Sequence, residues 1–216
     1  MTDPAAEDVR LVELLCGGDA NAARELYRRH GAALLRFGLA MGASRQVAED
    51  MVHDTFVEFL HDPRRFEASR GSVAGYLYGI ARHQWSRVAR RGWRESDEGA
   101  LAGDALRTDA AQLSEEAPDS EDALDRARLV DRVRAAVAAL PVVHREVVAL
   151  CDLEELPYAT VAQILDCPIG TVRSRLHRAR AALAQSLDTA RTPVAERRQE
   201  VAANAPPALA CPETPT

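Results

Sequence analysis

The sequence predicts an all-α protein in which two small helical domains are joined by a flexible acidic linker. Apolar residues recur at helical spacing on both sides of an acidic strip. Of the 216 residues, 47% are hydrophobic, many of them alanine, whereas only 5% are aromatic. This composition favours thin, alanine-packed helices over the thick core of a β-sandwich.

No segment is expected to cross a membrane. The longest apolar run without proline, residues 135–140, has only six residues. The N-terminus is acidic and lacks the apolar stretch of a signal peptide. We therefore expect a cytoplasmic protein that does not insert into membranes.

The formal net charge of −6 is distributed unevenly, and all 27 basic residues are arginine. Residues 10–95 carry a net charge of +4 and residues 126–187 carry +3, whereas residues 96–125 carry −9. The acidic strip also lacks aromatic residues, so it cannot bury enough apolar surface to offset the entropy of ordering. We predict a flexible linker over residues 96–125. Because five prolines follow Ala190, we predict a disordered tail over residues 188–216.

The first domain, residues 10–95, contains three predicted helices. The first starts at Ala22 and stops at Gly42, the second covers residues 45–60, and the third is capped by Ser72. The side chains expected to face the core are Ala23, Leu26, Tyr27, Leu34, Phe37, Met41, Val47, Met51, Val52, Phe56, Phe59, Leu60, Val73, Tyr76, Leu77, Ile80, Gln84 and Val88.

The second predicted helix carries a stripe of acidic residues on its outer face. Asp50, Asp54 and Glu58 follow one another at intervals of four residues, next to Glu49 and His53. Like charges at this spacing destabilise an isolated helix by about a few tenths of a kcal/mol per pair. The stripe is either a solvated helix face or a docking surface for a basic partner, and composition alone leaves both interpretations open.

A basic loop and the outer face of the third helix form a second candidate surface. The loop contributes Arg64, Arg65 and Arg70, and the helix contributes His83, Arg87, Arg90, Arg91 and Arg94, interleaved with Tyr78, Trp85 and Trp93. Binding of single-stranded nucleic acid requires cationic side chains along the phosphate backbone and aromatic rings on which unstacked bases can stack. In the alternative interpretation, Tyr78 and Trp85 pack in the core and the arginines are solvated.

The second domain, residues 126–187, contains a helix-turn-helix pattern. A short helix over residues 158–165 is followed by a turn and a long helix over residues 169–187. Asp166, in the turn, is expected to adopt a positive φ, which aspartate tolerates better than most residues. The side chains expected inside this domain are Leu129, Val130, Val133, Val137, Leu140, Val143, Val147, Val148, Cys151, Val161, Ala162, Leu165, Ile169, Val172, Leu176, Ala179 and Leu183.

The outer face of the last helix has the chemistry of a DNA-reading surface. Its polar side chains are Thr171, Arg173, Ser174, His177 and Arg178, with Arg175 and Arg180 at the margins. Arginine presents a bidentate fork to guanine in the major groove, and serine or threonine binds phosphates or base edges.

The sequence contains no recognisable catalytic or metal-binding pattern. The cysteines, Cys16, Cys151, Cys167 and Cys211, lack CxxC spacing, which indicates neither a zinc site nor a disulfide framework. No Ser-His-Asp arrangement or phosphate loop is recognisable either. We therefore expect no enzyme, no cofactor and no metal. Cys151 and Cys167 are expected to be small buried residues, with redox sensing as the alternative.

Three segments resemble the extracytoplasmic-function group of bacterial sigma factors. Residues 140–180, LPVVHREVVALCDLEELPYATVAQILDCPIGTVRSRLHRAR, resemble the family's region four almost throughout. Residues 48–56, AEDMVHDTF, resemble the helix of region two that binds core polymerase. Residues 76–83, YLYGIARH, resemble the segment that opens and reads the minus-ten promoter element, with His83 where the family commonly has asparagine.

This resemblance implies a sigma factor that binds core RNA polymerase and directs it to promoter DNA, with an anti-sigma factor as a further partner. The implied polymerase-binding residues are Glu49, Asp50, His53, Asp54 and Glu58. The implied minus-ten residues are Arg70, Tyr76, His83, Trp85, Arg87, Arg90 and Arg91. The implied minus-thirty-five residues are Thr171, Arg173, Ser174, Arg175, His177 and Arg178. The alternative function is a helix-turn-helix regulator whose N-terminal domain senses a ligand or partner and never contacts polymerase.

Overall fold

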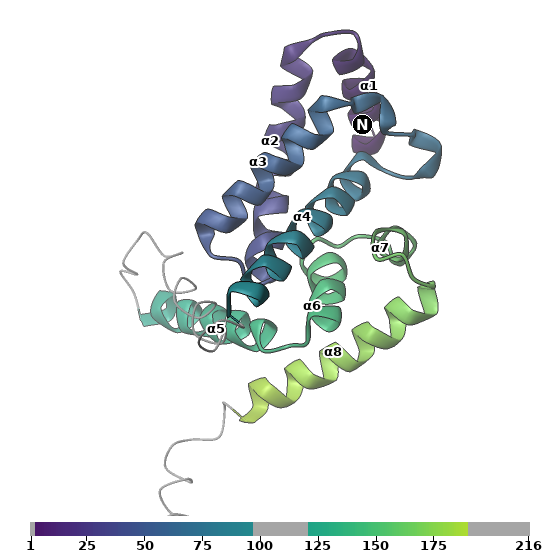
Figure 1. Cartoon of the computed structure of the whole chain (residues 1–216). Coiled ribbons are helices and arrows are strands. Elements are labelled where there is room, and N and C mark those ends of the chain that lie inside the picture. Colours follow the sequence, from purple (N-terminus) through teal and green to yellow (C-terminus); the bar gives the residue numbers. More distant parts are fainter. Residues whose placement is uncertain (1–2, 97–120, 190–216) are drawn as a thin grey trace, which may run out of the picture.

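The computed structural model describes residues 3–96, called the first half below, and residues 121–189, called the second half. All regular structure in these two ranges is helical, as predicted (Figure 1). The elements of the first half are α1 (Pro4–Cys16), α2 (Ala20–Ala40), α3 (Arg45–His61), the 3-10 turns η1 (Pro63–Arg65) and η2 (Ala68–Arg70), and α4 (Val73–Ser96). Those of the second half are α5 (Glu121–Ala138), α6 (Val142–Val148), the π-helical turn η4 (Ala149–Leu153), α7 (Tyr158–Ile164) and α8 (Ile169–Thr189).

Local capping signals explain where the helices of the first half begin and end. The hydroxyl of Ser44 accepts from the backbone N–H of Val47, and that of Ser72 accepts from Gly75 at 3.1 Å. Gly42, with φ +91°, terminates α2 as predicted. The helix α1 was not predicted, because Val12 is its only buried apolar residue and its exposed face is mostly polar.

The core of the first half forms where α2, α3 and α4 pack together. Its largest fully buried side chains include Leu26, Phe37, Phe59 and Leu77, and the ring of Phe37 meets that of Tyr78 edge-on at 5.6 Å. The prediction that Tyr27, Leu60 and Val88 face the core was wrong, since all three side chains are exposed. Each lies at the margin of a helical stripe, where spacing alone does not separate a buried position from an exposed one.

The second half is built on the predicted helix-turn-helix. Asp166 adopts the expected positive φ, 49°, in the turn between α7 and α8. Val161 and Val172 are fully buried where these two helices meet. Five side chains that were expected inside this domain are exposed, so the prediction of their burial was wrong. They are Leu129, Val130, Val133, Val143 and Ile169.

The predicted linker, residues 96–125, is shorter in the structure. The helix α4 includes Ser96, and α5 starts at Glu121, so residues 121–125 are helical. The middle of the predicted linker, residues 97–120, and the predicted tail from residue 190 lie outside the described residues.

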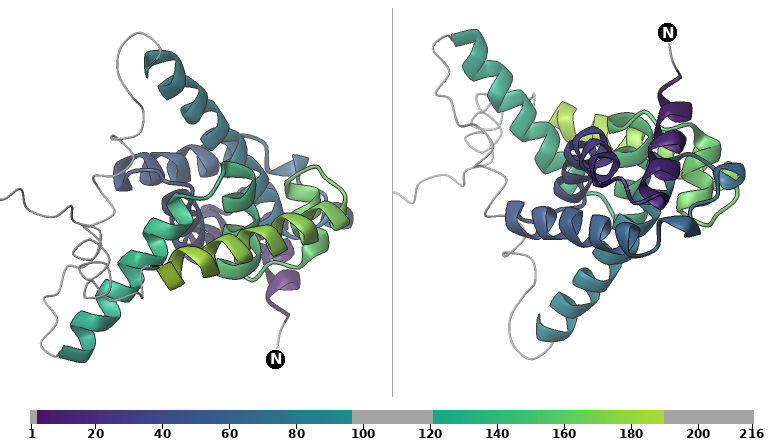
Figure 2. Two further views of the ribbon diagram at one scale, coloured as in Figure 1. Left: turned by 90° about the horizontal axis from the view of Figure 1, so that it is seen from below. Right: turned by 90° about the horizontal axis from the view of Figure 1, so that it is seen from above.

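The two halves pack directly against each other, which the sequence analysis did not anticipate. The helix α7 lies beside α4, and α6 lies between α4 and α8 (Figure 1). The C-terminal part of α4 and the N-terminal part of α5 diverge from this body (Figure 2). Among the described helices, none combines the length and the apolar character needed to cross a membrane.

The crossing of α2 and α3 depends on Gly38. A Cβ atom at this position would lie 2.8 Å from Cε of Met51 and 3.0 Å from Cβ of Ala48. We expect Gly38→Leu to lower the free energy of unfolding by about 1–3 kcal/mol through overpacking, measured by urea denaturation.

The matched control is Gly79→Ala, since a Cβ atom on Gly79 meets nothing within 4 Å. In this helix interior, alanine should raise the free energy of unfolding by about 0.5–1 kcal/mol. An unchanged urea midpoint for Gly38→Leu would show that α2 and α3 do not need this close approach.

Candidate nucleic-acid interface

The predicted reading face of α8 is accessible. Arg173, Ser174, His177 and Arg178 are exposed, whereas Thr171 and Arg175 are half-buried. The opposite side of α8 is anchored in the core by Val172, Leu176 and Ala179. The helix therefore presents a row of cationic and hydroxyl groups outward while its apolar row holds it in place.

Arg180 differs from the other arginines of α8, because it is already held by a carboxylate. Its Nε and Nη2 atoms donate to the two carboxylate oxygens of Asp152, at 3.1 and 2.5 Å. This contact raises the pKa of Arg180 further above its ordinary value. Within the described part of the chain, Arg173 and Arg178 have no such ion pair, so their guanidinium groups are free to bind a ligand.

The acidic stripe of α3 is exposed along its length. Glu49, Asp50, His53 and Asp54 all face solvent, and Glu49 accepts from Nε of Arg45 at 2.9 Å. Glu58, at the end of the stripe, has a different environment. It accepts from Nε2 of Gln84 on α4 at 2.6 Å and lines a pocket.

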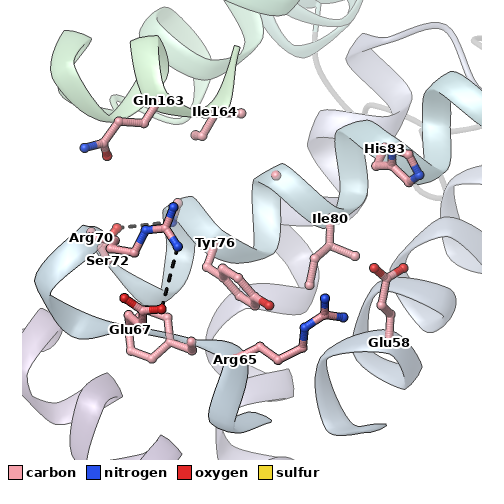
Figure 3. A pocket seen from close by; sticks show the side chains of 14 residues that line it. Glu58, Arg65, Glu67, Arg70, Ser72, Tyr76, Ile80, His83, Gln163 and Ile164 are labelled. Carbon is pink, nitrogen blue, oxygen red and sulfur yellow. Dashed lines mark hydrogen bonds and ion pairs between the residues drawn. The ribbon is translucent and has the colours of Figure 1, made fainter. Parts of the chain in front are cut away.

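This pocket has a volume of about 430 Å³ and lies between the η1–η2 loop, α4 and α7. Arg70, Tyr76 and His83, three predicted minus-ten residues, line it (Figure 3). Arg65 also reaches into it, and its far wall is formed by Gln163 and Ile164 of α7. Its volume is in the range of small-molecule sites. Aromatic and cationic groups on the same wall suit an unstacked base and its phosphate.

Phe66, which the sequence pattern does not single out as a site residue, also lines the pocket. Its ring packs edge-on against Tyr76, with centroids 5.8 Å apart. The feature of the sequence that could have identified Phe66 is its position between Arg65 and Arg70 in the basic loop.

Of the two interpretations of Tyr78 and Trp85, the structure supports the one in which both pack in the core, which argues against the minus-ten role that the resemblance implied for Trp85. Both rings are buried, because the side of α4 on which they lie packs in the core. Trp85 therefore offers no stacking surface to a base in this structure. Arg87 is exposed as expected. The side chains of Arg90 and Arg91 lie outside the described residues.

The cysteines of the described residues, Cys16, Cys151 and Cys167, are free and half-buried. Burial and the neighbouring carboxylate of Asp152 raise the pKa of the Cys151 thiol to about 11. A thiol is reactive as the thiolate, so this environment suppresses its reactivity at neutral pH. Cys151 fits the prediction of a small packing residue better than that of a redox sensor.

A helical DNA-binding protein with a helix-turn-helix is the class that this fold and these exposed arginines define. The Sigma-70 region 2 family matches residues 26–95, and the Sigma-70, region 4 family matches residues 131–183. The chain belongs to the extracytoplasmic-function group of RNA polymerase sigma factors, and its function is in transcription initiation. The match to region 2 argues against a ligand-sensing N-terminal domain.

Known relatives agree with this assignment. The chain is 30% identical to the ECF RNA polymerase sigma factor SigE of Mycolicibacterium smegmatis over 72% of its own length, and it spans only 58% of that relative. It is 32% identical to the ECF RNA polymerase sigma-E factor of Haemophilus influenzae, over 80% of this chain and 91% of the relative. The sigma factor RpoE from Bartonella quintana, solved in complex with the anti-sigma factor NepR, is similar in structure, with a TM-score of 0.57. That match has 25% identity and covers 76% of this chain and 98% of RpoE.

We expect Cys151 to resist alkylation. Unfolding should return its pKa from about 11 to about 9, which increases the thiolate fraction at pH 8 roughly a hundredfold. Iodoacetamide labelling at pH 8, followed by peptide mass spectrometry, should show slow modification in the native chain and fast modification in urea. Equal rates in the two states would contradict the raised pKa.

Proposed function

We propose that this sigma factor uses three surfaces of one chain in promoter recognition. The stripe Glu49, Asp50, His53, Asp54 and Glu58 binds core RNA polymerase. The pocket wall of α4 and the η1–η2 loop binds the melted minus-ten strand. The exposed face of α8 reads the minus-thirty-five element in the major groove. The observation that carries this assignment is that Arg173 and Arg178 on α8 are exposed and form no ion pair with any residue that the structure describes.

The residues proposed for the minus-ten strand divide by chemistry. Tyr76 supplies a ring at the pocket wall, and Arg70 and Arg87 supply exposed positive charge for phosphates. His83 supplies ring nitrogens that hydrogen-bond a base edge. Arg90 and Arg91 continue the same helix and are proposed as further phosphate contacts.

The proposed partners are core RNA polymerase, promoter DNA and an anti-sigma factor. The last is supported by the relative from Bartonella quintana, which was solved with one bound. The chain is proposed to act in the cytoplasm without a cofactor, a metal or catalytic chemistry of its own, because it directs an enzyme. Promoter selection from a random DNA library with reconstituted holoenzyme, followed by run-off transcription, tests this function. Polymerase binding without transcription from any selected sequence would contradict it.

We expect the double substitution Asp50→Arg, Asp54→Arg to weaken binding to core polymerase at least tenfold, because it reverses the charge of the stripe. Both side chains are exposed, so the helical circular dichroism spectrum should not change. Binding is measured by titrating labelled sigma factor with core enzyme at physiological salt.

The control for this double substitution is Glu13→Arg. It changes the charge of an exposed residue on α1, away from the stripe, and should leave the affinity unchanged. If the stripe variant and the wild type bind core polymerase with equal affinity, the stripe is only a solvated helix face.

Arg178 and Arg180 are expected to differ in function. Arg178→Ala should cost about 1–3 kcal/mol on the preferred promoter and relax preference at one base pair, because the exposed guanidinium reaches a base edge. Arg180→Ala should relax preference at no base pair and leave the salt slope nearly unchanged, because Asp152 already holds the Arg180 guanidinium. The measurement is binding to single-base variants of the minus-thirty-five element at several salt concentrations. If Arg178→Ala instead weakens binding to all variants equally, Arg178 does not belong to the face that reads bases.

A further inference from the structure

Arg180 lies in line with two side chains of the proposed reading face of α8. Arg173, His177 and Arg180 follow one another at intervals of four and then three residues, which places them on one side of the helix. With a rise of about 1.5 Å per residue, Arg180 lies about 10 Å along the helix axis from Arg173. All three side chains are exposed. By position alone, Arg180 is therefore a further cation that α8 presents to DNA.

The environment of its guanidinium distinguishes Arg180 from the rest of this row. Its Nε and Nη2 atoms donate to Oδ2 and Oδ1 of Asp152, at 3.1 and 2.5 Å, in the bidentate geometry in which a guanidinium and a carboxylate pair most strongly. Asp152 belongs to η4, a separate element of the second half. The side chain of Arg180 is 57% exposed and that of Asp152 is 27% exposed, so the pair lies at the surface.

The fold does not depend on this ion pair. Pairs that are partly exposed contribute little to stability, because water solvates the separated charges almost as well. The helix α8 is held in its domain by the buried side chains of Val172, Leu176 and Ala179. Stability alone therefore gives no reason for neutralising a cation in line with the reading face.

A DNA phosphate would have to displace Asp152 to reach the fork of Arg180. Both oxygens of this carboxylate are engaged, and because it belongs to the same chain it is always present beside the arginine. Displacement would also leave an unpaired carboxylate next to the negatively charged DNA backbone, and like charges brought together lower affinity. Arg180 is therefore expected to stay on Asp152 when α8 approaches a duplex.

We infer that Asp152 is a positioning residue that withholds Arg180 from the DNA backbone and so lowers the affinity of α8 for DNA of every sequence by the same factor. A phosphate contact carries no sequence information, whereas the forks of Arg173 and Arg178, which form no ion pair within the described ranges, suit base edges. Non-specific sites in a genome greatly outnumber promoters, so a weaker sequence-independent attraction leaves more of the protein for core polymerase. This inference rests on the proposed function of α8 and adds to it a residue outside that helix.

The test uses reconstituted holoenzyme and duplexes that carry single-base variants of the minus-thirty-five element. Asp152→Asn keeps the size of the side chain and removes its charge, which releases Arg180. Binding to every duplex should strengthen about threefold or more at ~0.1 M KCl, and the slope of log affinity against log salt should steepen by about 0.9, the value for one new phosphate contact. The order of preference among the duplexes should stay that of the wild type.

Two control variants separate the release of Arg180 from a general change in charge. Glu155→Gln removes a neighbouring exposed carboxylate and should leave the salt slope unchanged. Asp152→Asn combined with Arg180→Gln removes both members of the pair and should restore the wild-type affinity and slope. Helical circular dichroism and the urea midpoint show whether each variant is folded.

An unchanged salt slope for folded Asp152→Asn, or a gain in affinity that Glu155→Gln matches, would overturn the inference. A gain confined to changes at one base pair would overturn it too, since Arg180 would then contact a base. Arg180→Ala leaves Asp152 in place, so it tests the inference even if Asp152→Asn does not fold. A salt slope shallower by about 0.9 for Arg180→Ala would overturn it, because Arg180 would already bind a phosphate in the wild type.

The same measurements test the proposed function separately. If the wild-type holoenzyme shows no preference among the minus-thirty-five variants, α8 is not the reading helix, and the inference is overturned with the proposed function. If the wild type shows the preference and the slope of Asp152→Asn does not change, only the inference is overturned.

Discussion

The placement of the second half depends on one arginine that connects several helix ends. The guanidinium of Arg145 donates to the backbone carbonyls of Met41, Ala138 and Leu140, at the ends of α2 and α5 and just before α6. Helix C-termini leave carbonyl groups without intrahelical partners, and a guanidinium has enough donors to satisfy several of them. Burial lowers the pKa of Arg145, but its ordinary value is so high that the group stays charged. These bonds fix α6 against α2 and so position the helix-turn-helix that follows.

Besides the bonds of Arg145, the contact between the two halves is polar as much as apolar. Burying Glu146 and Glu154 requires desolvation that their ion pairs with two arginines of the first half largely offset, so such pairs add little net stability compared with an apolar contact. Separation of the halves would return both carboxylates to water, which makes separation less costly than exposing an apolar core of similar size.

Local signals explain what was predictable from the sequence. The cap at Ser72, the positive φ at Asp166 and the start of α8 at Ile169 each depend on a few neighbouring residues. The burial of Trp85 was not predictable, because it depends on which side of α4 meets the core. The pair Arg36–Glu154 joins residues 118 positions apart, and a single sequence contains no periodicity that links them. The pocket wall formed by α7 was missed for the same reason.

The packing of the two halves affects the two proposed DNA surfaces differently. On α8, Arg173, His177 and Arg178 remain exposed, because the helix binds its own core through the opposite row and does not use this face to contact the first half. On α4, Tyr76 lines the pocket whose opposite wall is formed by Gln163 and Ile164 of α7. The reading face proposed on α8 is therefore accessible in this structure, whereas the surface proposed on α4 faces α7 across the pocket.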